Sequence, residues 1–164
     1  MLKRRSTRIH SSKEREGVAA VEAAILLPVL LMLALGAIEI GIAMRAATIM
    51  QSAVREAGRL VNTDWSELVG DQDDPNTKLE RDLRNYVTAS GLPGSALVIS
   101  ITHAGADGGQ TFDLADPDNE LQHVKISLSL PHESISVFPN RYLRGSSIGA
   151  HLVMRAGLSG GLSN

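Results

Sequence analysis

The sequence predicts an α+β protein, in which a long N-terminal transmembrane helix extends into a small extracytoplasmic domain of a helix and an antiparallel sheet. Three observations support this fold class. Residues 23–38 are uncharged and lie in an apolar stretch over residues 18–44. Apolar residues then continue at helical spacing, and later segments have the composition or the alternation of strands. The predicted parts are a basic cytoplasmic leader, a transmembrane and extended helix, a linker, an extracytoplasmic α+β domain and a flexible tail (residues 1–17, 18–61, 62–77, 78–157 and 158–164).

The N-terminal leader is strongly basic although the whole chain is not. Residues 1–16 hold six of the 16 Lys and Arg residues and two of the 18 Asp and Glu residues, so this leader carries a net charge of +4 and the remainder carries −6. A nucleic-acid binder would instead spread basic groups over its folded surface, so no nucleic-acid partner is expected. The positive-inside rule places the leader in the cytoplasm and the chain after Met44 outside.

The apolar stretch is long enough to cross a bilayer. As a helix, residues 18–44 would measure roughly 40 Å, compared with about 30 Å for a hydrocarbon core. A secretory signal peptide would have a shorter apolar region, of about 7–15 residues. Pro28 removes one backbone hydrogen bond, which membrane helices tolerate. Small residues one turn apart, such as Ala37 and Gly41, either permit close helix packing or reflect ordinary membrane-helix composition.

The helix is predicted to continue beyond the membrane and to end near residues 62–64. An apolar stripe runs at steps of three and four, while Arg45, Arg55 and Arg59 fall largely outside it. The stripe consists of Ile42, Ala46, Ile49, Ala53, Ala57 and Leu60.

The outer domain begins after an acidic linker that ends at residue 77. Thr77 is expected to cap a helix over residues 78–89, which Gly91 and Pro93 would close. Four segments have strand character: residues 96–104, 110–114, 123–130 and 148–156. The third alternates cleanly, with Val124, Ile126, Leu128 and Leu130 on one face.

Two carboxylates interrupt the apolar stretch. A charge near the bilayer centre costs on the order of 3 kcal/mol on insertion scales, so such residues are functional candidates. Glu22 and Glu39 lie near opposite ends, and each could also serve as an ordinary interfacial residue. A basic leader, Gly17, and an apolar helix with Glu at its fifth position together resemble the site that prepilin peptidases cut in type IV pilin-like proteins. Cutting after Gly17 would free the amine of Val18, which shares a helix face with Glu22.

The wider stretch resembles the TadE-like family. The similar features are Glu22, Leu27-Pro28, Glu39-Ile40-Gly41 and "REAGR" at residues 55–59, and the specific resemblance covers residues 17–59. It implies a minor pseudopilin of the tight-adherence (Flp) pilus assembly system, a single-pass protein of the cytoplasmic (inner) membrane. The implied partners are pilins or pseudopilins, pilus assembly proteins and a prepilin peptidase. The implied site residues are Gly17 and Val18 for cleavage, and Glu22, Pro28 and Glu39 for assembly. Ala23 stands where the family usually has an aromatic residue.

Catalytic and metal-binding patterns are incomplete in this sequence, so no enzyme activity, cofactor, catalytic residue or metal ligand is predicted. Residues 145–149 fit G-x-S-x-G, but a strand and not a helix is expected to follow. Asp71, Asp73 and Asp74 resemble part of a calcium loop, but the glycine and the glutamate that such a loop needs are missing. The chain has no cysteine, which excludes thiolate metal sites. Two alternatives to the pseudopilin remain: an uncut bitopic scaffold of an envelope secretion complex, and a membrane-tethered ectodomain that binds a ligand.

Overall fold

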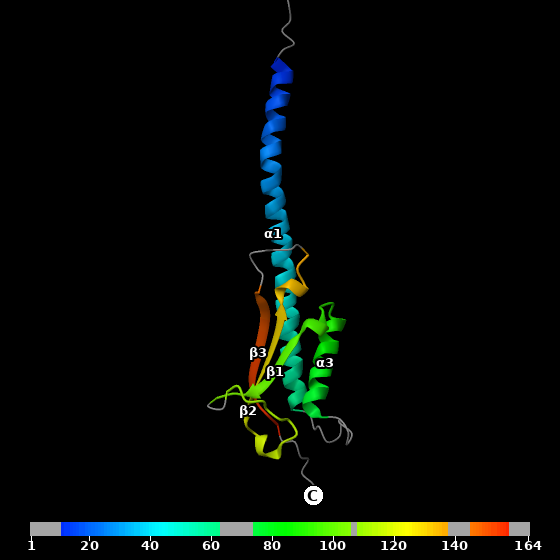
Figure 1. The fold of residues 1–164 in the computed structure, drawn as a ribbon, viewed down its shortest axis with the longest axis vertical. Helices are drawn as coiled ribbons and strands as arrows, with labels where there is room; N and C mark the ends of the chain where they lie inside the picture. The colour runs from blue at the N-terminus through cyan, green and yellow to red at the C-terminus, as the bar shows by residue number, and fades with distance from the viewer. Residues whose placement is uncertain (1–10, 63–73, 106–107, 138–144, 158–164) are drawn as a thin grey trace, which may run out of the picture. The chain divides into compact units, whose positions relative to one another are not determined.

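The computed structural model describes residues 11–62, 74–105, 108–137 and 145–157 (Figure 1). Their contacts divide the chain into two compact units, Met1–Ile40 and Gly41–Asn164. The predicted α+β class is confirmed, because a long N-terminal helix precedes a second helix and a three-stranded antiparallel sheet. The elements are α1 (Ser11–Val61), α3 (Pro75–Ala89), β1 (Val98–His103), β2 (His123–Pro131) and β3 (Ser147–Arg155), with short 3₁₀ turns at Gly94–Ala96, Pro117–Asn119 and His132–Ser134.

Helix α1 ends where the sequence predicts and begins earlier. Its last residue is Val61, but it starts at Ser11 and not at residue 18. Pro28 lies inside this continuous helix. Arg59 lies in the last turn, where a cation interacts favourably with the negative end of the helix dipole.

The later half of α1 belongs to the outer domain. One face of this half is buried. Arg45, Arg55 and Arg59, which were predicted to fall outside the apolar stripe, are exposed. Ile49 and Leu60 of the predicted stripe are partly buried. The domain therefore includes the helix from Gly41 onward, whereas the predicted domain began at residue 78. The buried face consists of Ala46, Met50, Ala53, Val54, Ala57 and Val61.

Helix α3 begins three residues before its predicted start. Asp74 is the N-cap, and its carboxylate accepts hydrogen bonds from the Thr77 N–H and hydroxyl, both at 2.9 Å. Pro75 occupies the first turn, where its missing N–H costs nothing. The prediction that Thr77 caps this helix is therefore wrong, and residues 74–77 do not form a linker. Residues 63–73 of the predicted linker lie outside the described residues.

The end of α3 confirms the predicted stop at Gly91. This glycine has φ +85°, a left-handed conformation that residues with a Cβ rarely adopt. The Gly91 N–H donates to the Thr88 carbonyl, and the Leu92 N–H donates to the Val87 carbonyl. These two bonds form the Schellman arrangement, which satisfies carbonyls at the helix end.

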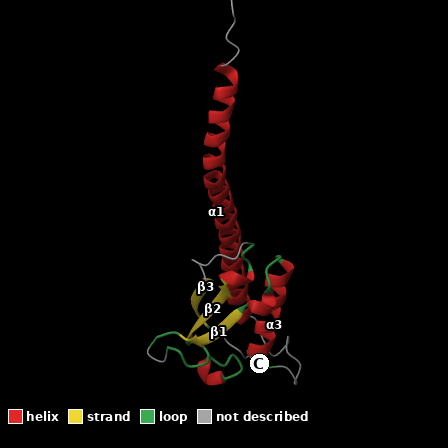
Figure 2. Cartoon of the chain, turned by 45° about the horizontal axis from the view of Figure 1, so that its top comes forward, coloured by secondary structure: helices red, strands yellow, loops and turns green. Residues whose placement is uncertain are grey.

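The three strands pair in the order β1-β2-β3, antiparallel throughout. Ile101 pairs with Ile126, and Leu128 pairs with Ala150. The predicted alternation of β2 is confirmed, because Val124, Ile126, Leu128 and Leu130 are at most 1% exposed. That face packs with the later half of α1 and with Leu79, Leu83 and Val87 of α3 to form the core (Figures 1 and 2).

The predicted strand over residues 110–114 does not form. This segment makes a single bridge, Thr102 to Thr111. Two backbone groups that would continue the pairing are bound by a side chain of α3 instead: the Asn76 amide donates to the Phe112 carbonyl at 2.7 Å and accepts from the Leu114 N–H at 2.9 Å. Phe112 is nevertheless buried, so this segment contributes a side chain to the core without forming a strand.

Candidate functional site

The first candidate site is the apolar part of α1. Among the described residues, one helix, Gly17–Val61, is long and apolar enough to cross a membrane, and none of its most apolar window is buried by the protein. Large side chains such as Ile25, Leu30 and Leu33 are 62–67% exposed. Exposed apolar area of this extent needs lipid or other helices to cover it. A single N-terminal apolar helix fits a single-pass membrane protein.

The predicted cleavage residues lie within this helix. Gly17 and Val18 are both exposed, and nothing lies within 4 Å of the position of a Cβ on Gly17. A glycine inside a helix weakens it by about 1 kcal/mol relative to alanine. Local unwinding of α1 at Gly17 therefore costs less than it would at an alanine. Cleavage itself stays a prediction.

Glu22 and Pro28 are exposed on the same apolar part of α1. Glu22 follows Val18 by four residues, which places the two on one helix face. The Glu22 carboxylate is therefore accessible to a neighbouring helix. Pro28 lies inside the helix without interrupting it.

Glu39 differs from Glu22 in its surroundings. It is 7% exposed, whereas its neighbours Ile38 and Ile40 are 50% and 62% exposed. Glu39 and Ala46 are seven positions apart, which is close to two helical turns, so they lie on the same side of α1. The sequence does not reveal the burial of Glu39, because both Glu22 and Glu39 are single carboxylates near an end of the apolar stretch.

The two glutamates are about 26 Å apart along the helix, since 17 residues separate them at 1.5 Å each. They point in directions about 100° apart around the axis. This spacing approaches the ~30 Å thickness of the hydrocarbon core, so the two carboxylates can lie near its opposite borders. Both predicted assembly carboxylates are thus compatible with a single crossing of the bilayer.

Beyond the membrane segment, Gly58 brings α1 close to the sheet. A Cβ built on Gly58 would lie 2.5 Å from Leu152 Cδ2 and 3.1 Å from Met154 Sδ. The close packing of α1 against β3 therefore explains why a glycine stands at this position of "REAGR". In the same segment Arg59 pairs with Glu56 at 2.6 Å, on the exposed side of the helix. Exposed pairs of this kind add little stability.

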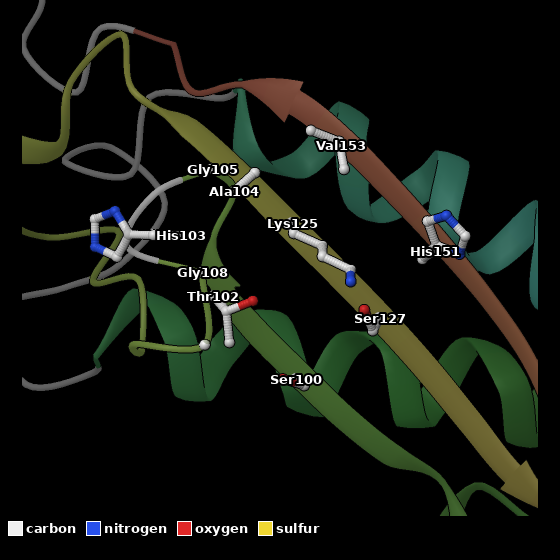
Figure 3. Close-up of a pocket in the computed structure, with 11 residues that line it drawn as sticks. Ser100, Thr102, His103, Ala104, Gly105, Gly108, Lys125, Ser127, His151 and Val153 are labelled. Atoms are coloured by element: carbon white, nitrogen blue, oxygen red, sulfur yellow. The ribbon is translucent and has the colours of Figure 1, made fainter.

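A second candidate site is a hollow of about 660 Å³ over the open face of the sheet (Figure 3). Lys125 and Ser127 of β2 lie between Ser100 and Thr102 of β1 and His151 of β3, and Gly105, Gly108 and Gly109 also line the hollow. The lining includes hydroxyls, an ammonium group and imidazoles, and no carboxylate from the described residues. Such a surface suits a polar or anionic molecule.

The catalytic and metal patterns do not assemble in the described residues. Ser147 is the first residue of β3, whereas the hydrolase motif needs its serine in a turn between a strand and a following helix. The carboxylates of Asp113 and Asp116 accept hydrogen bonds from backbone N–H groups two residues on, as turn residues do. Groups of His, Asp and Glu that could hold a metal ion are not found in the described part of the chain.

Comparison with known proteins returned one finding. The family model for TadE-like proteins matches residues 17–59. This match confirms the resemblance predicted from the sequence, over the same segment, and it contains every predicted cleavage and assembly residue. Together with the apolar helix, it indicates a membrane protein associated with the Tad pilus. Neither the search of curated proteins nor the search of solved structures gives a match.

Proposed function

We propose that this protein is a non-enzymatic minor pseudopilin that helps to assemble the tight-adherence (Flp) pilus and its secretion system. The observation that carries the proposal is the TadE-like match over residues 17–59, which coincides with the exposed apolar part of α1. The helix contacts pilin-like helices within the inner membrane. The basic leader lies in the cytoplasm, and the domain from Gly41 onward lies outside.

Glu22 acts in this proposal through a neighbouring helix. Cutting after Gly17 leaves a positive amine on Val18, one turn from Glu22 on the same face. With the two glutamates near the borders of the hydrocarbon core, the Val18 amine lies about 6 Å nearer the cytoplasm than Glu22 does. Each charge alone is therefore tolerated by the headgroup layer. The attraction between the Val18 amine and a Glu22 on the adjacent copy then sets the register of the two helices.

Glu39 has a different role in this proposal. Because it is buried, its carboxylate is shielded from lipid and from neighbouring helices. We assign it to the placement of the helix and not to contact between copies. Pro28 serves assembly by leaving one carbonyl of α1 without its usual intrahelical N–H donor, which a polar group of a neighbouring helix can bind.

The test compares Glu22→Ala and Glu22→Gln with Glu56→Gln, which changes a partly buried glutamate of the same helix beyond the apolar stretch. Membrane insertion should be unchanged in all three, or slightly easier in Glu22→Ala because a carboxylate is gone. Co-purification with pilus components should fall for both Glu22 variants and persist for Glu56→Gln. Glu22→Gln keeps the shape and loses the charge, so its failure identifies charge as the requirement.

Two other functions remain as outcomes of this test. If the wild-type chain keeps its leader and Glu22→Ala co-purifies normally, an uncut bitopic scaffold explains the protein better. The hollow over the open face of the sheet supports a membrane-tethered, ligand-binding domain. Loss of pilus assembly on Lys125→Gln, with the Glu22 variants normal, would favour that function.

A further inference from the structure

A second cavity lies in the outer domain at the start of its part of α1. It has a volume of about 390 Å³ and is here called the rim pocket. Its lining comes from three places: Ile42 and Arg45 of α1, the turn Gly91–Pro93 after α3, and the segment Ser134–Val137 after β2. All three lie within the unit Gly41–Asn164.

Arg45 is held in place at one side of this pocket. Its Nη2 donates a hydrogen bond of 3.2 Å to the carbonyl of Ser90, the C-cap residue of α3. A Cβ on Gly91 would lie 3.1 Å from the same nitrogen, so the glycine that ends α3 also makes room for the guanidinium. A guanidinium has five N–H donors in a planar fork. One bond to Ser90 therefore leaves donors for an anion in the pocket.

The rest of the pocket is apolar. Besides Arg45 and Ser134, its lining side chains are Ile42, Leu92, Pro93, Ile135 and Val137, and no acidic side chain of the described residues is among them. Val137 is 62% exposed. An apolar hollow with one positively charged wall matches a molecule that carries an anionic group next to an apolar body.

The position of Arg45 in the chain favours a lipid as that molecule. Between Arg15 and Arg45 there is no Lys or Arg, so Arg45 is the first cation after the apolar stretch. Ile42 is the last large residue but one of that stretch and lines the same pocket. With the proposed single crossing of the membrane, the rim pocket would lie where α1 leaves the hydrocarbon core, at the depth of the lipid phosphates.

The sequence after Val137 is rich in residue types that are common at membrane interfaces. Residues 138–144 read "FPNRYLR" and contain two aromatic and two arginine residues, although aromatic residues make up 3% of the chain. Tyr and Arg are typical of membrane interfaces. These residues lie outside the described part of the chain and are not included in the site.

We propose that the rim pocket binds the phosphate of an anionic phospholipid of the outer leaflet, with Arg45 as its ligand and the apolar side chains against the glycerol and upper acyl chain. This inference rests on the proposed single crossing of the membrane and does not depend on pilus partners. Bound lipid would fix the height and tilt of the outer domain above the bilayer. Neighbouring copies would then present their helices to one another at a common depth.

The experiment uses the full chain purified in a mild non-ionic detergent, with native mass spectrometry to count bound lipids. Phosphatidylglycerol and phosphatidylcholine of the same acyl chains are added in separate titrations. The wild-type protein should retain one phosphatidylglycerol and bind phosphatidylcholine more weakly. Arg45→Gln should weaken phosphatidylglycerol binding roughly tenfold, the equivalent of one charge-assisted hydrogen bond. The matched control is Arg55→Gln, an exposed arginine of α1 outside the pocket, which should bind as the wild type does.

A second variant and a competitor complete the test. Val137→Glu keeps Arg45 and adds a carboxylate to the pocket, so it should weaken binding even if Arg45→Gln proves unstable. Glycerol phosphate, which has the headgroup chemistry and no acyl chains, should not displace the lipid; displacement would identify a site for free phosphate. Equal binding by wild type, Arg45→Gln and Val137→Glu overturns the proposal, as does an equal loss in Arg55→Gln. Failure here would leave the co-purification results for Glu22 unaffected, so the two proposals fail separately.

Discussion

Replacing Gly58 with valine should loosen the packing of α1 against the sheet. Even a single Cβ at this position would lie 2.5 Å from Leu152 Cδ2, whereas carbon atoms in contact are normally about 3.5–4.0 Å apart. Met154 Sδ lies 3.1 Å from the same Cβ position. The Leu152 side chain must therefore move by about 1 Å and Met154 by a few tenths of an ångström, and valine adds two methyl groups to the same space.

The expected cost follows from two opposing effects. Overpacking a well-packed core costs about 1–3 kcal/mol. Valine forms helix better than glycine by roughly 0.4 kcal/mol, which offsets a small part of that cost. The net loss of unfolding free energy is therefore about 0.5–2.5 kcal/mol, and for a domain of this size the unfolding temperature should fall by roughly 2–10 °C.

Thermal unfolding of the full chain in detergent, followed by circular dichroism, measures this change. Gly41→Val is the matched control, because Gly41 lies in the same helix with nothing within 4 Å of its Cβ position. Adding Leu152→Ala to Gly58→Val should recover part of the loss, since it removes the atoms that clash. Equal unfolding temperatures for Gly58→Val and Gly41→Val, with no coupling to Leu152→Ala, would refute the close approach of α1 to β3.

Two further changes test other parts of the structure. Asp74→Ala should lower the unfolding free energy by about 1 kcal/mol because α3 loses its N-cap, whereas Asp74→Asn should be nearly neutral; chemical denaturation of both variants checks this, and equal effects would contradict the capping role. Ser147→Ala should leave pilus assembly intact in cells, since this serine begins a strand and not a nucleophile turn; a loss of assembly with the protein folded and abundant would mean that Ser147 has a function.

Local pattern predicted those elements whose burial repeats with a regular period. The alternation of Val124 to Leu130 fixed the inner face of β2, and the spacing of Ala46, Ala53 and Ala57 fixed one side of α1. Met50 and Val54 were missed because the buried face is wider than the predicted stripe.

The errors arise where a distant residue decides the local structure. Residues 110–114 have strand composition, but Asn76 of α3 binds the backbone groups that a neighbouring strand would need. The start of α3 depends on the carboxylate of Asp74, which competes as a cap with Thr77 only three residues away. The strand over residues 110–114 and the N-cap of α3 both depend on where other groups lie in the folded chain. The sequence pattern around each segment does not contain that information.

The sequence predicted only part of the candidate site, because other parts depend on tertiary packing. Gly17, Val18, Glu22, Pro28 and Glu39 are identifiable from their positions in the apolar stretch. The burial of Glu39 and the hydrogen bond from Arg45 to Ser90 depend on tertiary packing. For Arg45 the sequence held one signal, its place as the first cation after the membrane segment.

The mature N-terminus of the protein, measured by mass spectrometry on material purified from the membrane, tests the pseudopilin proposal most directly. The proposal predicts that the wild-type chain begins at Val18, and that Gly17→Ala leaves the basic leader attached and the chain beginning at Met1. A wild-type protein that retains residues 1–17 would contradict the proposal, because Val18 would then carry no free amine for Glu22 to meet.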